Sequence, residues 1–171
     1  MTGFLTLDDI DVAHKRVLVR ADLNVPVKDG RVTDTTRIDR TAVTLSELMD
    51  KGARVIVLSH FGRPKGGPDP KLSLKPVLEP LGAALGGRSV AFAEDCVGPA
   101  AEQAVARLGD GKVLLLENLR FHKEEEANDA DFANRLAALG DVYVNDAFST
   151  AHRAHASTEA IARALPAAAG R

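Results

Sequence analysis

The sequence contains few of the residues that mark disulfide-rich, nucleic-acid-binding or membrane proteins. Its 171 residues include one cysteine, no tryptophan and one tyrosine, and aromatic residues make up 4%. A single cysteine, Cys96, cannot form an internal disulfide or a paired redox motif, so we expect it to act as a small buried hydrophobic side chain. The scarcity of aromatic rings and the net charge of −2 argue against a nucleic-acid partner.

Several longer motifs are missing as well. The sequence contains no run of eighteen apolar residues that would predict a transmembrane helix. Residues 1–9 lack the basic flank and apolar stretch of a signal peptide. We therefore expect a cytoplasmic protein with no membrane partner. No segment has the spacing of a phosphate-binding loop. Gly109 and Gly111 precede an apolar run instead of following one, unlike the glycines of a dinucleotide fingerprint.

The chain does contain short apolar runs that alternate with helical periodicities. The apolar runs predict strands at residues 17–19, 54–58, 89–92, 113–116 and 142–144. Apolar repeats at three and four residues predict helices near residues 38–49, 77–85, 99–108, 132–139 and 157–165. Such alternation is typical of βαβ units with a parallel sheet. We expect Ser73 to cap the second helix and Pro80 to kink or shorten it, and residues 124–126, all glutamate, to be a solvated stretch before the next helix.

This pattern predicts an α/β, Rossmann-like domain of three layers. A mostly parallel sheet of about six strands should lie between helices on both faces, because continuous apolar runs indicate strands that are covered on both sides. The sixth strand is expected near the C-terminus. Residues 1–171 are expected to form a single domain, since this length suits one core better than two.

Cationic and polar residues follow four of the five predicted strands. They are Arg20, Asp22, Asn24, Arg37, His60, Arg63, Arg120 and Arg153. The carboxyl ends of parallel strands meet at one edge of a sheet, where doubly wound folds bind their ligands. An isolated surface arginine is usually only a solvated charge, but several that converge favour binding of phosphate or carboxylate. His152 and His155 could ligate a metal, but no third ligand has a suitable spacing, so we expect no metal site in this chain.

Five segments, taken together and in order, resemble those of phosphoglycerate kinases. They are residues 17–26 (VLVRADLNVP), 59–64 (SHFGRP), 116–121 (LENLRF), 144–148 (VNDAF) and 151–157 (AHRAHAS). The resemblance covers nearly the whole chain. It implies reversible phosphoryl transfer between 1,3-bisphosphoglycerate and ADP, giving 3-phosphoglycerate and ATP, as a step of glycolysis.

The resemblance also implies roles for the residues at the strand ends. Asp22 and Asn24 would orient the glycerate hydroxyl, and Arg37 would face the carboxylate and the transferring phosphoryl group, as a catalytic residue. Four residues would hold the phosphate that is not transferred, namely His60, Arg63, Arg120 and Arg153. For Arg20, a structural role in steadying Asp22 or the strand end fits at least as well.

The resemblance covers only one half of the family's architecture. Family members are more than twice as long, with Mg²⁺ and ATP or ADP bound by a C-terminal nucleotide domain. We expect this chain to be the N-terminal half that binds 3-phosphoglycerate or 1,3-bisphosphoglycerate, to hold no cofactor itself, and to be inactive without its partner domain. Two other functions stay open from sequence, a stand-alone anion-binding module and a basic surface that docks an acidic partner.

Overall fold

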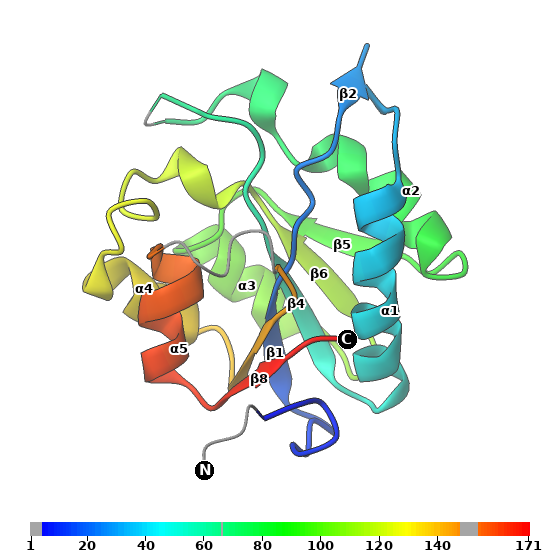
Figure 1. The fold of residues 1–171 in the computed structure, drawn as a ribbon, viewed down its shortest axis with the longest axis vertical. Helices are drawn as coiled ribbons and strands as arrows, with labels where there is room; N and C mark the ends of the chain where they lie inside the picture. The colour runs from blue at the N-terminus through cyan, green and yellow to red at the C-terminus, as the bar shows by residue number, and fades with distance from the viewer. Residues whose placement is uncertain (1–4, 66, 148–153) are drawn as a thin grey trace.

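The computed structural model describes residues 5–65, 67–147 and 154–171, and in them a six-stranded sheet forms the centre of the fold (Figure 1). Its strands lie in the order β5-β6-β4-β1-β7-β8, and each neighbouring pair is parallel. The strands are β1 (Arg16–Arg20), β4 (Arg54–Leu58), β5 (Val90–Ala93), β6 (Val113–Leu116), β7 (Val142–Asn145) and β8 (Ala167–Ala169). The five predicted strands and the expected sixth are thus confirmed.

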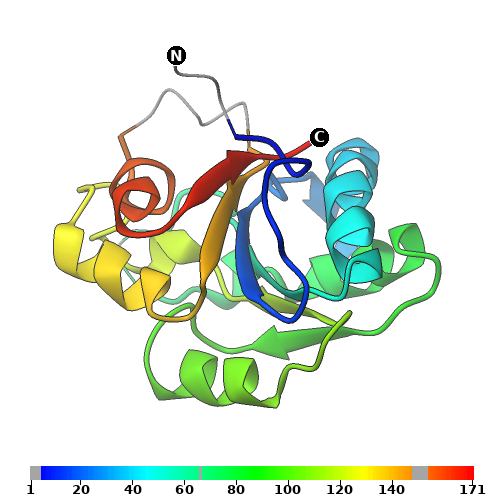
Figure 2. The ribbon, with the colours of Figure 1, turned by 90° about the horizontal axis from the view of Figure 1, so that it is seen from below.

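Helices cover both faces of this sheet. They are α1 (Thr36–Asp50), α2 (Leu78–Ala84), α3 (Pro99–Arg107), α4 (Ala130–Ala137) and α5 (Ile161–Ala164). Figure 2 shows α1, in cyan, on one side of the sheet and α4, in yellow, and α5, in orange-red, on the other. Right-handed crossovers explain this division, because strand connections that run in opposite directions along a parallel sheet place their helices on opposite faces. The three-layer α/β fold is confirmed. None of the helices in the described ranges is long and apolar enough to cross a membrane.

The core consists of two buried clusters, one on each side of the sheet. Val17 and Val19 belong to the cluster under α1 and α2, whereas Leu18 between them belongs to the cluster under α3, α4 and α5. Alternate side chains of one strand point to opposite faces. Because both faces are buried, the strand reads as a continuous apolar run.

The helix boundaries differ from prediction in two places. The chain enters α2 through two short 3-10 turns, Pro70–Leu72 and Lys75–Val77. The Ser73 hydroxyl donates to Glu117 (Oγ to Oε2, 2.6 Å) and accepts the backbone N–H of Lys75 (3.2 Å), so it caps the second turn and not α2 itself. Pro80 lies in the first turn of the helix, where a missing N–H costs little, so no kink is needed. The last predicted helix begins as a single π-helical turn, Ala156–Ala160, before α5.

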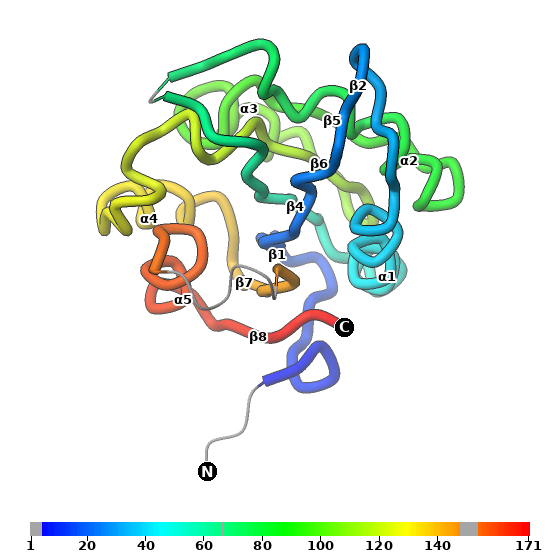
Figure 3. The backbone as a smooth tube through the Cα atoms, turned by 45° about the horizontal axis from the view of Figure 1, so that its top comes forward, coloured from blue at the N-terminus to red at the C-terminus, as the bar shows by residue number. Residues whose placement is uncertain are grey.

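A two-stranded hairpin was missed by the sequence analysis. It pairs β2 (Val27–Lys28) with β3 (Arg31–Val32) and projects past the main sheet (Figure 3). Asp29 and Gly30 form its turn with φ of 52° and 75°. Two positive φ angles in an Asp-Gly turn are the pattern of a type I′ hairpin, so the signal was present in the sequence.

The acidic run at residues 124–126 is not simply a solvated stretch, and this prediction was wrong. Glu125 is completely buried, because the turns after β6 fold it against the segment that begins the π-helical turn. Its carboxylate accepts hydrogen bonds from the backbone N–H of Ser157 (2.9 Å) and from the Ser157 hydroxyl. The expectation that Cys96 is buried is confirmed.

Candidate anion-binding site

The strand order brings the predicted polar residues to one edge of the sheet. The four neighbouring strands β6, β4, β1 and β7 all end at this edge, since they run parallel. The connection after β1 crosses one face through α1, whereas the connection after β7 crosses the other face through α5. Adjacent strands whose connections diverge leave a crevice at their carboxyl ends, where α/β proteins bind ligands.

Arg20, the last residue of β1, is fully buried at this edge. Its Nε donates to the Ser157 hydroxyl (2.9 Å), one terminal nitrogen donates to the Ala21 carbonyl (2.6 Å), and the other contacts Nδ1 of His60 (2.8 Å). A guanidinium can only donate, so His60 must accept at Nδ1 and carry its proton on Nε2. The expected structural role of Arg20 therefore includes fixing the tautomer of His60.

A second layer of contacts holds Arg20 in place. Ser157 links it to the buried carboxylate of Glu125, and the Tyr143 hydroxyl donates to the Ser157 carbonyl (2.7 Å). Burial lowers the pKa of Arg20, and the nearby charge of Glu125 opposes this shift. Glu125 and Ser157 were not among the predicted site residues, and no local pattern marks them because their contact joins segments 32 residues apart.

Arg120 follows β6 and is also buried, with 6% of its surface exposed. One terminal nitrogen donates to the Gly62 carbonyl (3.3 Å), while its Nε and its other terminal nitrogen are buried and find no hydrogen-bond acceptor among the described residues. Asn118 fixes the backbone here, since its Oδ1 accepts from the backbone N–H groups of both Phe61 and Arg120 (3.1 and 3.0 Å). A buried guanidinium with unused donors is energetically costly, and an anion that accepts hydrogen bonds from those donors would offset this cost.

His155 is a further buried group near these arginines. Burial lowers its pKa, and so do the nearby charges of Arg120 and Arg20, while Glu125 opposes them. Its Nδ1 makes no hydrogen bond within the part of the chain that the structure describes. A neutral ring with an unused nitrogen adds a second polar group that a ligand could satisfy.

A more exposed group lies at the start of α1. Arg37, in the first turn of the helix, donates to the Asn24 carbonyl (2.6 Å) and contacts the Asp22 carboxylate (3.4 Å). The Asn24 side chain accepts from the backbone N–H of Gly62 (3.0 Å), which ties this group to the loop that Arg120 contacts. Arg37 also borders a surface cavity of about 410 Å³, which is lined by Asp22, Arg37, Arg40, Thr41, Val43, Asp146 and Arg171.

The structure thus brings most, but not all, of the predicted site residues into contact. Arg120, Asn24, Arg37 and Asp22 are linked through the backbone at Gly62. His60 contacts Arg20, whose pKa is affected by the nearby charges of Asp22 and Arg120. Arg63 is exposed and lines a separate surface cavity with Lys65 and Asp69. Arg153 and His152 lie outside the described residues.

Together these features give an α/β fold with cationic side chains gathered at the carboxyl ends of its strands. A family model described as phosphoglycerate kinase matches residues 7–171. The phosphoglycerate kinase of Rhodospirillum centenum is 68% identical over 169 residues, which cover 99% of this chain and 42% of that protein. That of Methylorubrum extorquens is 66% identical over 172 residues and is covered to 43%.

Solved structures agree with this assignment. Phosphoglycerate kinase from Coxiella burnetii superposes with a TM-score of 0.86 at 38% identity, over 98% of this chain and 41% of that one. The enzyme from Pyrococcus horikoshii gives 0.87 at 32% identity, over 97% and 42%. The chain therefore belongs to the phosphoglycerate kinase family, as the sequence resemblance implied. It spans well under half the length of these relatives.

Proposed function

We propose that this chain is the acceptor-substrate domain of a phosphoglycerate kinase. In this role it binds 3-phosphoglycerate or 1,3-bisphosphoglycerate while the phosphoryl group moves reversibly between 1,3-bisphosphoglycerate and ADP. Residues 1–171 act as one domain, and a nucleotide domain outside this chain is its partner. Family membership supports the reaction, and the anion-binding edge supports the assignment of the substrate half.

The observation that carries the proposal is the state of Arg120. Two of its nitrogens are buried without an acceptor in the described structure. A phosphate dianion satisfies such donors by charge-assisted hydrogen bonds. Arg120 and His60 therefore hold the phosphate that is not transferred, and Arg63 and Arg153 complete its binding.

The other half of the site suits the reacting end of the substrate. In this reaction the acceptor is a carboxylate, which is already ionised at neutral pH and needs no general base. It needs positioning and compensation of charge on the moving phosphoryl group. Arg37 supplies a guanidinium at that end as the catalytic residue, while Asp22 and Asn24 orient the glycerate hydroxyl.

Nucleotide and Mg²⁺ bind outside this chain. The anion-binding edge does not suit Mg²⁺, which prefers oxygen ligands, because its donors are mainly guanidinium and imidazole groups. Among the described carboxylates near this edge, Asp22 contacts Arg37, Glu125 accepts hydrogen bonds from Ser157, and burial raises the pKa of Asp146 to about 6. The lack of any nucleotide motif in the sequence agrees with this division.

Titration of the 171-residue chain with 3-phosphoglycerate, followed by calorimetry or NMR, tests the proposal. We expect weak, salt-sensitive binding and no binding of ATP. Arg120→Met should reduce affinity by about 1.5–3 kcal/mol, roughly ten- to a hundredfold. It should not lower the free energy of unfolding of the unliganded chain, since it removes a buried charge that has one long hydrogen bond, to the Gly62 carbonyl (3.3 Å), and two nitrogens without an acceptor among the described residues.

Two controls sharpen the test. Arg107→Met alters an exposed arginine at the far end of α3 and should leave binding unchanged. Sulfate should compete only weakly, because it lacks the carboxylate and hydroxyl. Equal binding of sulfate and 3-phosphoglycerate would instead favour a surface for an acidic partner, and ATP binding without a response to 3-phosphoglycerate would overturn the proposal.

A further inference from the structure

A second group of ligand-type side chains lies at the same edge of the sheet, beyond β5 and β6. Asp95 and Cys96 follow β5, and His122 follows β6. The two strands are hydrogen-bonded neighbours whose last residues, Ala93 and Leu116, are paired. Their loops therefore leave the sheet side by side and bring together residues 27 positions apart in the chain.

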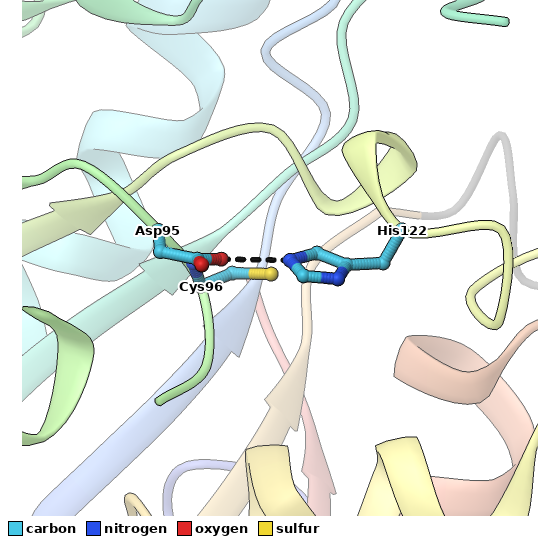
Figure 4. Close-up of side chains that lie close together, drawn as sticks. All are labelled: Asp95, Cys96 and His122. Atoms are coloured by element: carbon cyan, nitrogen blue, oxygen red, sulfur yellow. Dashed lines mark hydrogen bonds and ion pairs between the residues drawn. The ribbon is translucent and has the colours of Figure 1, made fainter. Parts of the chain in front are cut away.

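The three side chains converge on one point. The distance from Asp95 Oδ1 to His122 Nε2 is 2.7 Å, and one ligand atom from each of the three residues lies within 4.8 Å of the others. Figure 4 shows the sulfur of Cys96 pointing toward the imidazole ring, beside the carboxylate. Cys96 is buried, but the side chains of Asp95 and His122 are 43% and 26% exposed, so a small ion can enter from solvent on that side.

The surrounding structure fixes the three groups before any ligand arrives. The Asp95 carboxylate accepts the backbone N–H of Cys96 (2.7 Å) and that of Val97 (3.4 Å). The His122 ring packs against Phe132 with centroids 5.2 Å apart. Ligands that are held by their neighbours lose little conformational entropy when a metal binds.

We propose that Asp95, Cys96 and His122 form a binding site for a divalent metal ion of borderline softness, Zn²⁺ in the first place. Carboxylate oxygen, thiolate sulfur and imidazole nitrogen are the ligand types of zinc. With the thiol proton released to solvent, two anionic ligands and one neutral ligand cancel the charge of the ion. No fourth histidine, cysteine or carboxylate side chain joins the group within the described ranges, so a water molecule completes the coordination on the exposed side.

Only a small rearrangement is needed. Tetrahedral zinc with bonds of about 2.0–2.3 Å separates its ligand atoms by roughly 3.3–3.8 Å. The ion therefore replaces the hydrogen bond between Asp95 and His122 and moves those two atoms apart by less than about 1 Å. The sulfur, which lies within 4.8 Å of the other two ligand atoms, moves closer to them by at most about 1.3 Å.

The chain also contains a matched pair without a cysteine. His14 and Asp110 lie 2.6 Å apart, with side chains 77% and 38% exposed, and Asp110 also accepts from Arg54 (2.9 Å). An aspartate–histidine contact alone is thus an ordinary surface ion pair. The buried sulfur distinguishes the Asp95 group from it.

Titration of the 171-residue chain with Co²⁺ tests the site. Thiolate-to-cobalt charge transfer produces a near-ultraviolet band, and visible bands of high intensity report tetrahedral coordination. We expect both, and we expect Zn²⁺ to displace Co²⁺. Cys96→Ser should abolish the ultraviolet band. His122→Gln should weaken Co²⁺ binding by more than about a hundredfold, since loss of outer contacts alone costs roughly 10–100-fold. Asp95→Asn should weaken it less, and the control His14→Gln should not change it.

Cys96 is buried, so its serine variant could fail to fold. The partly exposed His122 and Asp95 variants carry the test in that case, with far-ultraviolet circular dichroism as the check on folding. Absence of a charge-transfer band in the unaltered chain, or a band of equal strength in folded His122→Gln and Asp95→Asn variants, would overturn the proposal.

Discussion

The anion-binding edge has a buried half and an exposed half, and the structure holds them in different ways. Arg20 is 0% exposed and donates to three fixed partners, whereas the side chain of Arg37 is 50% exposed and contacts one carbonyl and one carboxylate. A buried guanidinium loses its hydrogen bonds to water, and fixed acceptors in the protein must replace them. An exposed one keeps water and can change its contacts.

This difference separates two tasks within one site. The hydrogen bonds of the buried half form as the protein folds. They hold its side chains in fixed positions, which suits the binding of a phosphate. The exposed half can move with a group whose charge shifts during a reaction. Substitution of Arg20, whose nitrogens all have hydrogen-bond partners, should therefore change the free energy of unfolding first, and substitutions in the exposed half should change ligand binding or rate alone.

Arg20→Ala should have the largest effect on the free energy of unfolding. It leaves Glu125 buried without its nearby cation and removes the hydrogen bonds to Ser157 and His60. Removing one partner from such a buried network costs about 3–5 kcal/mol, and urea denaturation would measure it. The matched control is Arg54→Ala, whose partner Asp110 is exposed and whose loss should cost less than about 1 kcal/mol. Equal losses for the two variants would mean that burial does not separate the halves.

Arg37→Ala addresses the exposed half. In a two-domain enzyme that carries this chain as its first domain, kcat should fall by about a hundredfold or more, because a preorganised donor for developing charge is lost. KM should rise less, since the interaction strengthens in the transition state. Arg37→Lys should recover only part of the rate, because it restores the charge without the planar fork.

Steady-state kinetics and thermal melting together decide between catalysis and folding. The melting temperature should not change, because Arg37 lies on the exposed side of the first turn of α1. Arg31→Ala, in the exposed hairpin strand β3, is the control with no expected effect on either quantity. A normal kcat at a normal melting temperature would remove the catalytic role, and a large fall in melting temperature would assign Arg37 to folding.

The sheet and the gathering of polar side chains at one of its edges were predictable because both depend on local patterns. Strands that are buried on both faces appear as continuous apolar runs, and parallel topology then places whatever follows them at one edge. For this reason His60, Arg120 and Arg37 could be assigned to one site without coordinates. Their division into a buried and an exposed half could not, because burial depends on what the rest of the chain packs over each residue.

The errors have the same physical origin. Three consecutive glutamates look solvated, yet Glu125 is buried through its contact with a segment 32 residues later. The grouping of Asp95 with His122 was not predictable for a similar reason, because only the pairing of β5 with β6 brings these distant residues together. The missed hairpin differs, since its Asp29-Gly30 turn is a local signal.

Asp146 lies between the two halves and gives the smallest expected effect. Its backbone N–H donates to the Arg20 carbonyl (2.8 Å), and its carboxyl borders the cavity that Arg37 lines. Burial raises the pKa of this carboxyl to about 6, and a hydrogen bond from the Thr44 hydroxyl (2.9 Å) partly opposes the shift. The folded state therefore holds this proton at a pH where the unfolded chain, with a pKa near 3.8, has lost it.

The free energy of unfolding should fall as pH rises through this range. Between about pH 4 and pH 6, Asp146 binds more protons in the folded state than in the unfolded state. The stability that Asp146 contributes is therefore complete below about pH 4 and is lost as pH rises through about 6. Because the group is partly exposed, we expect only about 1 kcal/mol. Asp146→Asn should flatten the unfolding free energy across this interval in urea melts. The control, Asp141→Asn, should act only toward lower pH, because Arg16 lowers the pKa of Asp141. An unchanged slope between pH 4 and pH 6 in Asp146→Asn would show that this carboxyl is already ionised, as it would be if the exposed half of the site extended to it.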